Sequence, residues 1–342
     1  MKIFLLEYIT GGGFNKHTLP NALLQEGLLM RDALLRDFSG LADIEVVTTY
    51  DVRLDKPELA IAISVDSNAN PISIWQTLLT ECDAALIVAP ETDHILTDLT
   101  QILTKSAVCN LGCNLHAVVI TSNKFDTFKS LKNDGILTIE THMLDAVDAS
   151  YFETLHNGFV VKPIDGAGCE NTLYFQCLLD LKEWIDTKFL QPHQMEKLIV
   201  QPYMAGQPAS ISALFKKGKA WVLSCNVQKI SMQVSQSKQM SMEYAGSTVN
   251  GLTEFSASFD DLVNKIAKAL PDLNGYVGID VIIHNQHIYV VEINPRITTS
   301  YIGLRESLSM NPAALILELA SNENFKLPQI MTRYSVNIEL HA

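Results

Sequence analysis

The chain has 342 residues, of which 47% are hydrophobic and 18% charged, and its formal net charge is −13. This length allows two or three domains with real cores, and the acidic balance argues against a nucleic-acid partner, which needs a broad basic surface. No apolar run reaches the roughly 18 residues of a membrane helix, and the six cysteines are scattered, so we expect a cytoplasmic protein with reduced thiols.

The first third of the chain alternates strand-like and helix-like segments, which predicts a parallel, doubly wound α/β sheet: a Rossmann-like domain over residues 1–115. Glycines 11–13 follow its first strand, where a glycine-rich turn can bind phosphate. Their spacing is not a dinucleotide fingerprint, so a simple flexible turn or a loop that touches substrate is favoured. Expected strands are Ile3–Ile9, Ile44–Thr48, Leu59–Val65 and Ala84–Val88, and expected helices are Asn21–Phe38 and Ile72–Thr80.

A second domain is expected over residues 116–200, and it contains two lysines in suggestive positions. Lys124 lies in the first turn of a helix that Asn123 can cap. Lys162 lies near the end of an apolar strand, before a loop that holds Gly166 and Gly168. There an ammonium can reach phosphate oxygens while the glycines let backbone N–H groups approach closely. A lysine snorkelling from a strand end is an equally weighted alternative.

The other elements of this domain are expected as strands at Ile136–Ile139, Phe159–Pro163 and Thr172–Phe175 and a helix at Leu178–Phe189. A strand at Leu198–Tyr203 leads through a linker into the next region. A third domain is expected over residues 201–342. Its polar segment Ser231–Met242 is typical of a mobile loop. Its strands are expected at Ser210–Phe215, Ala220–Val227, Tyr276–His284 and Ile288–Ile293, and its helices at Leu262–Leu270, Tyr301–Ser309 and Ala313–Leu319.

The third domain ends in the most informative segment, Val290–Arg296. Glu292 and Asn294 are two residues apart on a predicted strand, so their side chains share one face. Asp280 interrupts the preceding apolar strand, where a carboxylate is costly unless it is paired or bound to metal. If the two strands form a hairpin, the three side chains offer oxygen ligands that suit Mg²⁺. The alternative is a structural ion pair, for example between Asp280 and Arg296.

Taken in this order, these residues resemble the ATP-grasp superfamily over the whole chain. The resemblance implies an ATP-grasp fold behind an N-terminal Rossmann-like (pre-ATP-grasp) domain, with ATP and Mg²⁺, or Mn²⁺, as cofactors. Members often place an acid for the ribose where residues 206–210 have none. The implied nucleotide-binding residues are Lys124, Lys162, Gly166, Gly168, Gln201, Tyr203 and Met204, and the implied metal ligands are Asp280, Glu292 and Asn294.

Within the superfamily, Ser122-Asn123-Lys124 and Glu292-Ile293-Asn294-Pro295-Arg296 resemble a group of carboxylate–amine ligases. This implies ATP-dependent amide formation through an acylphosphate, with tyramine and L-glutamate as a candidate substrate pair. Homodimers are common among such ligases. Arg296 and Lys229 are implied as catalytic residues, and Arg305 and Lys238 could hold a second substrate carboxylate. Two alternatives stay open: another amino-acid or peptide ligase of the D-alanine–D-alanine type, and a non-catalytic nucleotide-binding regulator.

Overall fold

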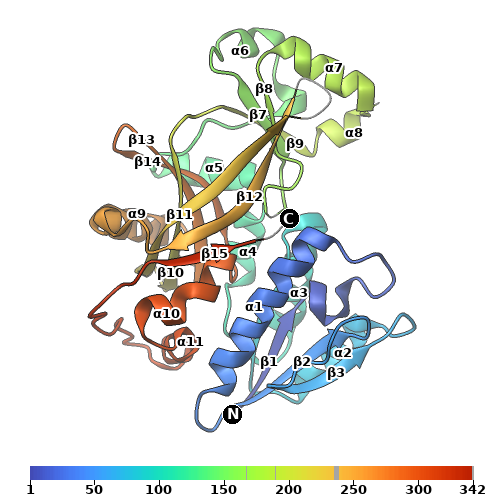
Figure 1. Cartoon of the computed structure of the whole chain (residues 1–342), viewed down its shortest axis with the longest axis vertical. Coiled ribbons are helices and arrows are strands. Elements are labelled where there is room, and N and C mark those ends of the chain that lie inside the picture. Colours follow the sequence, from blue (N-terminus) through green and yellow to red (C-terminus); the bar gives the residue numbers. More distant parts are fainter. Residues whose placement is uncertain (167, 189, 235–238, 341–342) are drawn as a thin grey trace.

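The structure is a computed structural model that describes residues 1–340 except 167, 189 and 235–238. Its described strands form two sheets, one of five strands and one of ten. Figure 1 shows the smaller sheet with α1–α3 at the N-terminal end of the molecule, and the long β11–β12 hairpin that runs from the C-terminal elements toward α6 and α7.

The N-terminal sheet has the order β3-β2-β1-β4-β5, and all of its pairings are parallel. All five residues of β4 are buried, as expected for a parallel strand covered on both faces. The predicted α/β alternation is therefore confirmed. The elements are β1 Lys2–Glu7, α1 Asn21–Ser39, β2 Glu45–Asp51, β3 Ile61–Val65, α2 Pro71–Thr80, β4 Ala84–Val88, α3 Ile95–Lys105 and β5 Cys109–Asn110.

The glycine run after β1 forms a helical turn, Ile9–Gly13, that packs against β2. The Thr49 hydroxyl of β2 donates a hydrogen bond of 2.8 Å to the carbonyl oxygen of Gly11. The Trp75 indole N–H of α2 donates in turn to the Thr49 hydroxyl at 3.0 Å. These bonds tie the turn to its own sheet.

The second sheet has the order β14-β13-β10-β11-β12-β8-β7-β9-β6, with β15 paired to β12, and its pairings are antiparallel. Its strands are β6 His142–Met143, β7 Phe159–Pro163, β8 Leu173–Phe175, β9 Leu198–Pro202, β10 Gln207–Lys216, β11 Lys219–Val234, β12 Met240–Val249, β13 Gly275–His284, β14 His287–Asn294 and β15 Val336–Glu339. Its helices are α4 Leu115–Thr121, α5 Lys124–Asn133, α6 Ala149–Glu153, α7 Leu178–Lys188, α8 Pro192–Met195, α9 Ser256–Ala269, α10 Leu304–Leu308 and α11 Pro312–Ser321.

Two sequence predictions were wrong in this region. Within the described residues, Ser231–Met242 belongs largely to β11 and β12, because Met232 pairs with Met242 and Gln233 with Ser241. A backbone ladder between adjacent strands outweighs the polar composition there. Ile136–Ile139 forms no strand, and Thr138 makes an isolated bridge to Val290 instead.

The two sheets share a continuous core. Phe4 and Leu6 of β1 belong to the same buried cluster as Phe215 of β10 and Val277 of β13. Near the C-terminal end of α1, Asp37 is fully buried and accepts a 3.0 Å bond from Arg305 of α10. The N-terminal elements are thus fixed against the C-terminal ones. No helix among the described residues combines the length and the apolar character that crossing a bilayer requires.

Gly275 offers a test of this junction. It is the first residue of β13, has a φ of 71°, and packs against the segment that follows β5. A Cβ atom there would lie 2.5 Å from the carbonyl oxygen of Leu111, whereas a Cβ at Gly135 (φ 69°) would meet nothing within 4 Å. Both Gly275→Ala and Gly135→Ala incur backbone strain of about 1 kcal/mol, and Gly275→Ala should lose a further ~1–3 kcal/mol to overpacking. Urea midpoints of the two variants measure the difference, and equal midpoints would contradict this packing.

Candidate active site

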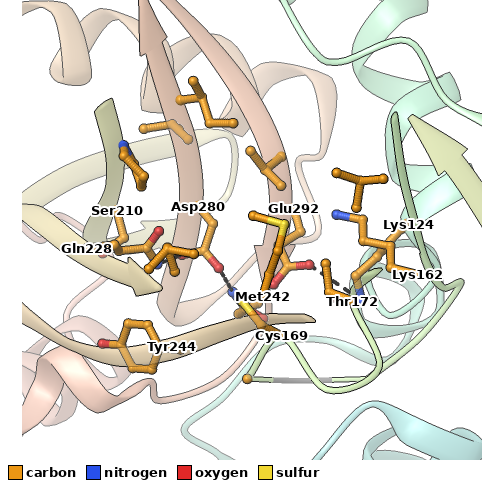
Figure 2. Close-up of a pocket in the computed structure, with 18 of the residues that line it drawn as sticks. Lys124, Lys162, Cys169, Thr172, Ser210, Gln228, Met242, Tyr244, Asp280 and Glu292 are labelled. Atoms are coloured by element: carbon orange, nitrogen blue, oxygen red, sulfur yellow. Dashed lines mark hydrogen bonds and ion pairs between the residues drawn. The ribbon is translucent and has the colours of Figure 1, made fainter. Parts of the chain in front are cut away.

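A cleft of about 420 Å³ is lined by residues of both ends of the larger sheet and by α1 of the N-terminal unit. Figure 2 shows the two lysines on the side of Glu292, with Gln228 and Ser210 on the side of Asp280. The cleft gathers the sequence-predicted residues Lys124, Lys162, Gly166, Gly168, Gln201, Tyr203, Met204, Asp280, Glu292, Asn294 and Arg296.

The two carboxylates face each other across the β13–β14 hairpin. Asp280 is the direct partner of Glu292 in the strand register, and Asn294 lies two residues beyond Glu292 on the same face. The Asn294 amide donates to Asp280 Oδ2 at 3.1 Å, and the Gln228 amide donates to Asp280 Oδ1 at 2.8 Å. The tight turn at Asn285 and Gln286, both at positive φ, sets the register as far as Val281 and Val290, and a β-bulge beyond that pair brings Asp280 opposite Glu292.

Lys124 is paired with Glu292, and the charge of the nearby Lys162 acts on the same carboxylate. Lys124 begins α5, whose Asn123 cap accepts two backbone N–H bonds of 3.0 Å, so its side chain leaves the first helical turn in a fixed direction. Its Nζ lies 3.4 Å from Glu292 Oε2 and donates to the Gly166 carbonyl at 3.0 Å. Lys162 is the fourth residue of β7 and is buried.

The charged side chains of the cleft strongly shift one another's pKa values. Burial alone would raise the pKa of Glu292, but the ammonium groups of Lys124 and Lys162 lower it to about 2. Burial and the neighbouring Glu292 charge raise the pKa of Asp280 well above its usual value. Burial lowers the pKa of Lys162, and Glu292 partly opposes that shift. Glu292 is thus held ionised, whereas Asp280 lacks a cation to balance it.

The donor set fits a hard divalent cation. It consists of two carboxylates and one carboxamide, and within the described ranges no three His, Cys, Asp or Glu side chains come close enough to share a metal ion. Oxygen donors of this kind suit Mg²⁺ or Mn²⁺ rather than zinc. A divalent cation there would also relieve the repulsion that raises the pKa of Asp280.

The strand β9 leads into a less polar part of the cleft. Gln201 is buried, and its amide donates to the Thr141 hydroxyl at 2.8 Å. The backbone N–H of Tyr203 donates to the Gly158 carbonyl at 3.1 Å. Apolar residues here can cover a flat ring while polar groups lie at the other end of the cleft. They include Val160, Met204, Ile230, Met242 and Ile282.

Arg296 also lines the cleft, but its position depends on a residue that the sequence did not single out. Arg296 Nε and Nη2 donate to the two carboxylate oxygens of Glu91 at 2.9 Å each, and both side chains are almost fully buried. Glu91 follows β4 at the carboxyl end of the parallel sheet, where ligand sites of such sheets gather. This position after a parallel strand was the sequence signal that could have identified Glu91 as a site residue. Glu26 of α1, also missed, lines the same cleft.

Three predicted cations are not placed in the cleft. Lys229 is absent from the described lining, although Gln228 and Ile230 beside it line the cleft, and its Nζ lies 3.8 Å from Glu339 Oε1. Alternation along β11 turns Lys229 away from the cleft. Arg305 instead holds Asp37 of α1, as described above. Lys238 lies outside the described residues.

Comparisons with known proteins agree with this geometry. A family model described as an ATP-grasp domain matches residues 121–300, and one described as a pre ATP-grasp 3 domain matches residues 44–118. The chain is 31% identical to the tyramine–L-glutamate ligase of Methanocaldococcus jannaschii, over 95% of this chain and 91% of that protein. It is 29% identical to the enzyme of the same name from Methanocaldococcus fervens, over 98% and 99%.

Among solved structures, a putative ATP-grasp superfamily protein from Archaeoglobus fulgidus superposes with a TM-score of 0.69. The match is at 23% identity and covers 93% of this chain and 88% of that one. At this identity the likeness concerns the fold alone.

The buried Glu91–Arg296 pair generates a stability prediction. Glu91→Leu should lower the free energy of unfolding by about 3–5 kcal/mol, because it leaves a buried guanidinium without its counter-ion. The double variant Glu91→Leu/Arg296→Met should recover most of that loss, since neither charge remains. Denaturant titration of the three proteins measures both effects. A double variant no more stable than Glu91→Leu would show that the unpaired charge is not the cause.

Proposed function

The chain belongs to the ATP-grasp family and is an ATP-dependent, ADP-forming ligase that joins a carboxylate to an amine; on that premise we propose that it joins L-glutamate to tyramine. The observation that carries the choice of substrates is the similarity of about 30% identity to two tyramine–L-glutamate ligases along nearly the whole chain. The cleft supports the ligase chemistry, because it combines paired cations for phosphates with oxygen ligands for a metal ion.

ATP lies in this cleft with its base between the end of β9 and the apolar side chains and its phosphates toward the lysines. Gln201, Tyr203 and Met204 meet the base, and Lys124 and Lys162 bind phosphate oxygens. Asp280, Glu292 and Asn294 hold Mg²⁺, or Mn²⁺. When bound, the metal neutralises charge on the phosphates.

The segment Asp165–Asn171 closes the phosphate end. Asp165 Oδ2 accepts a 3.0 Å bond from the backbone N–H of Asp93, and Lys124 binds the Gly166 carbonyl from within the cleft. Ala167 of this segment lies outside the described residues. The segment thus bridges the N-terminal unit and α5. This closure excludes water from an acylphosphate that would otherwise hydrolyse.

The reaction takes place in two steps. A carboxylate oxygen of the acid bonds to the γ-phosphorus of ATP, and the bond from that phosphorus to ADP breaks. The amine nitrogen then bonds to the acyl carbon, and phosphate leaves with the electrons of the carbon–oxygen bond. Arg296 steadies the transferring phosphoryl group: beyond its bonds to Glu91 and Ile297, the guanidinium carries further N–H donors.

The substrates are tested by ADP release with ATP, Mg²⁺, L-glutamate and tyramine, followed by mass analysis of the amide. We expect ADP only when both substrates are present. ADP formation only with another pair, such as two molecules of D-alanine, would refute these substrates and leave the ligase class intact. No turnover with a broad panel of acids and amines would favour the nucleotide-binding regulator.

Glu292→Ala should reduce turnover at least ~100-fold, because it removes a carboxylate that holds both lysines and the metal ion. Glu323→Ala is the matched control, since that carboxylate is exposed and paired with Lys217. The coupled ADP assay compares the two variants. Near-normal turnover of Glu292→Ala would refute the proposed metal and phosphate site.

Lys162→Met should weaken ATP binding about tenfold or more, because the loss of one charge-assisted phosphate contact costs ~1.5–3 kcal/mol. Lys229→Met removes a lysine on the far side of β11 and should bind ATP as the wild type does. Calorimetric titration with ATP and Mg²⁺ measures both affinities. Equal affinities for the two variants would count against the role of Lys162.

A further inference from the structure

Glu26 is a carboxylate of the cleft that the steps above do not use. It projects from α1 and lines the cleft beside Arg296 and Thr299, so the N-terminal unit contributes it to a site built mainly by the larger sheet. Across the part of the chain that the structure describes, its carboxylate makes no hydrogen bond or ion pair. A half-buried carboxylate without a partner is unfavourable and is expected to meet a ligand.

The packing of α1 fixes where Glu26 lies. The next residue, Gly27, rests on Glu7 of β1, and a Cβ there would lie 2.8 Å from Glu7 Oε2. Glu7 is itself buried and accepts bonds of 2.7 Å from both the backbone N–H and the hydroxyl of Thr10. This contact between Gly27 and Glu7 fixes the position of α1 on the sheet. The side chain of Glu26 therefore reaches the cleft from a fixed backbone position.

Glu26 lies at the phosphate end of the cleft rather than at the base end. A Cβ added to Gly168, in the segment that covers the phosphates, would lie 3.6 Å from Glu26 Oε1. The Arg296 charge is also close enough to lower the pKa of Glu26 in part. The acylphosphate forms at this end, so the attacking amine must approach here as well.

The charge balance favours a cation beside Glu26. Arg296 is already neutralised by the two oxygens of Glu91, so Glu26 is not needed as its counter-ion. The carboxylates of Glu91 and Glu26 carry two negative charges, whereas Arg296 carries one positive charge, so one negative charge is left unbalanced. An amine substrate arrives as an ammonium ion, which supplies the missing positive charge.

We infer that Glu26 binds the ammonium group of the amine substrate and accepts the proton that this group loses before it attacks the acylphosphate. The ammonium gives one proton to the carboxylate of Glu26, and the free nitrogen bonds to the acyl carbon. The carbon–oxygen bond to phosphate breaks, and the departing phosphate takes the second proton of the nitrogen. This inference rests on the proposed ligase function.

The acid–base properties of Glu26 suit this role. Burial raises its pKa to about 7, with Arg296 opposing the shift. A proton acceptor works best when its pKa lies near the operating pH. Glu26 can therefore take a proton during the attack and release it to solvent afterwards.

The test compares amide formation with hydroxamate formation in the same variant. Hydroxylamine is largely unprotonated at neutral pH and captures the acylphosphate without giving up a proton first. Glu26→Gln should lose amide formation with tyramine by about 100-fold or more, the typical contribution of a positioned base. Its hydroxamate formation from glutamate and ATP should stay within a few-fold of the wild type, which also shows that the variant is folded.

Asp32→Asn is the matched control, because Asp32 is an exposed acid of the same helix, paired with Arg31. It should leave both products unchanged. Glu26→Asp keeps the carboxylate and should retain more amide formation than Glu26→Gln.

Equal loss of amide and hydroxamate in Glu26→Gln, or loss of neither, would overturn the inference while the wild type still makes both products. If the wild type makes neither product from glutamate, the proposed function fails, and the role of Glu26 as written falls with it.

Discussion

Glu292 lies opposite Asp280 in a buried hairpin, and two lysines from distant segments hold its charge in place. The ammonium of Lys124 comes from the start of α5 and that of Lys162 from β7, which lies far from β14 in the order of the sheet. A buried carboxylate so placed is stable only while those cations stay close. The rest of the cleft depends on this arrangement, because it brings the two ends of the larger sheet together around the phosphate and metal positions.

The N-terminal unit completes the phosphate end without contributing to the metal position. Glu91 fixes Arg296 by two hydrogen bonds, and α1 places Glu26 beside it. The same unit is tied to the C-terminal elements through Asp37, near the end of α1, and Arg305 of α10. In the proposed reaction, substrate chemistry and nucleotide binding therefore come from different parts of the chain, which share a continuous core.

Local sequence patterns predicted those site residues whose role follows from their position within a single strand or turn. The two-residue spacing of Glu292 and Asn294 and the interrupting Asp280 suffice to predict a hairpin with three oxygen ligands. The observed register pairs Asp280 with Glu292, and the Asn294 amide donates to Asp280. The order of these motifs along the chain predicted the fold and the family.

Contacts between distant segments could not be predicted in this way. Glu91 and Glu26 matter because the N-terminal unit packs against the cleft, and no local spacing reports that packing. Lys229 was placed in the site from its position near a strand end, but β11 continues past it and turns its side chain away. The described residues of the polar segment after it belong to β11 and β12, because pairing with a neighbouring strand, rather than composition, decides their structure.

In the proposed mechanism, a substrate carboxylate attacks ATP in this cleft to form an acylphosphate. Glutamate labelled with oxygen-18 in its carboxylates tests it most directly, in a reaction with tyramine, ATP and Mg²⁺. We expect the inorganic phosphate released to carry one oxygen-18 atom for each amide formed. Unlabelled phosphate alongside labelled amide, or release of AMP and pyrophosphate, would contradict it.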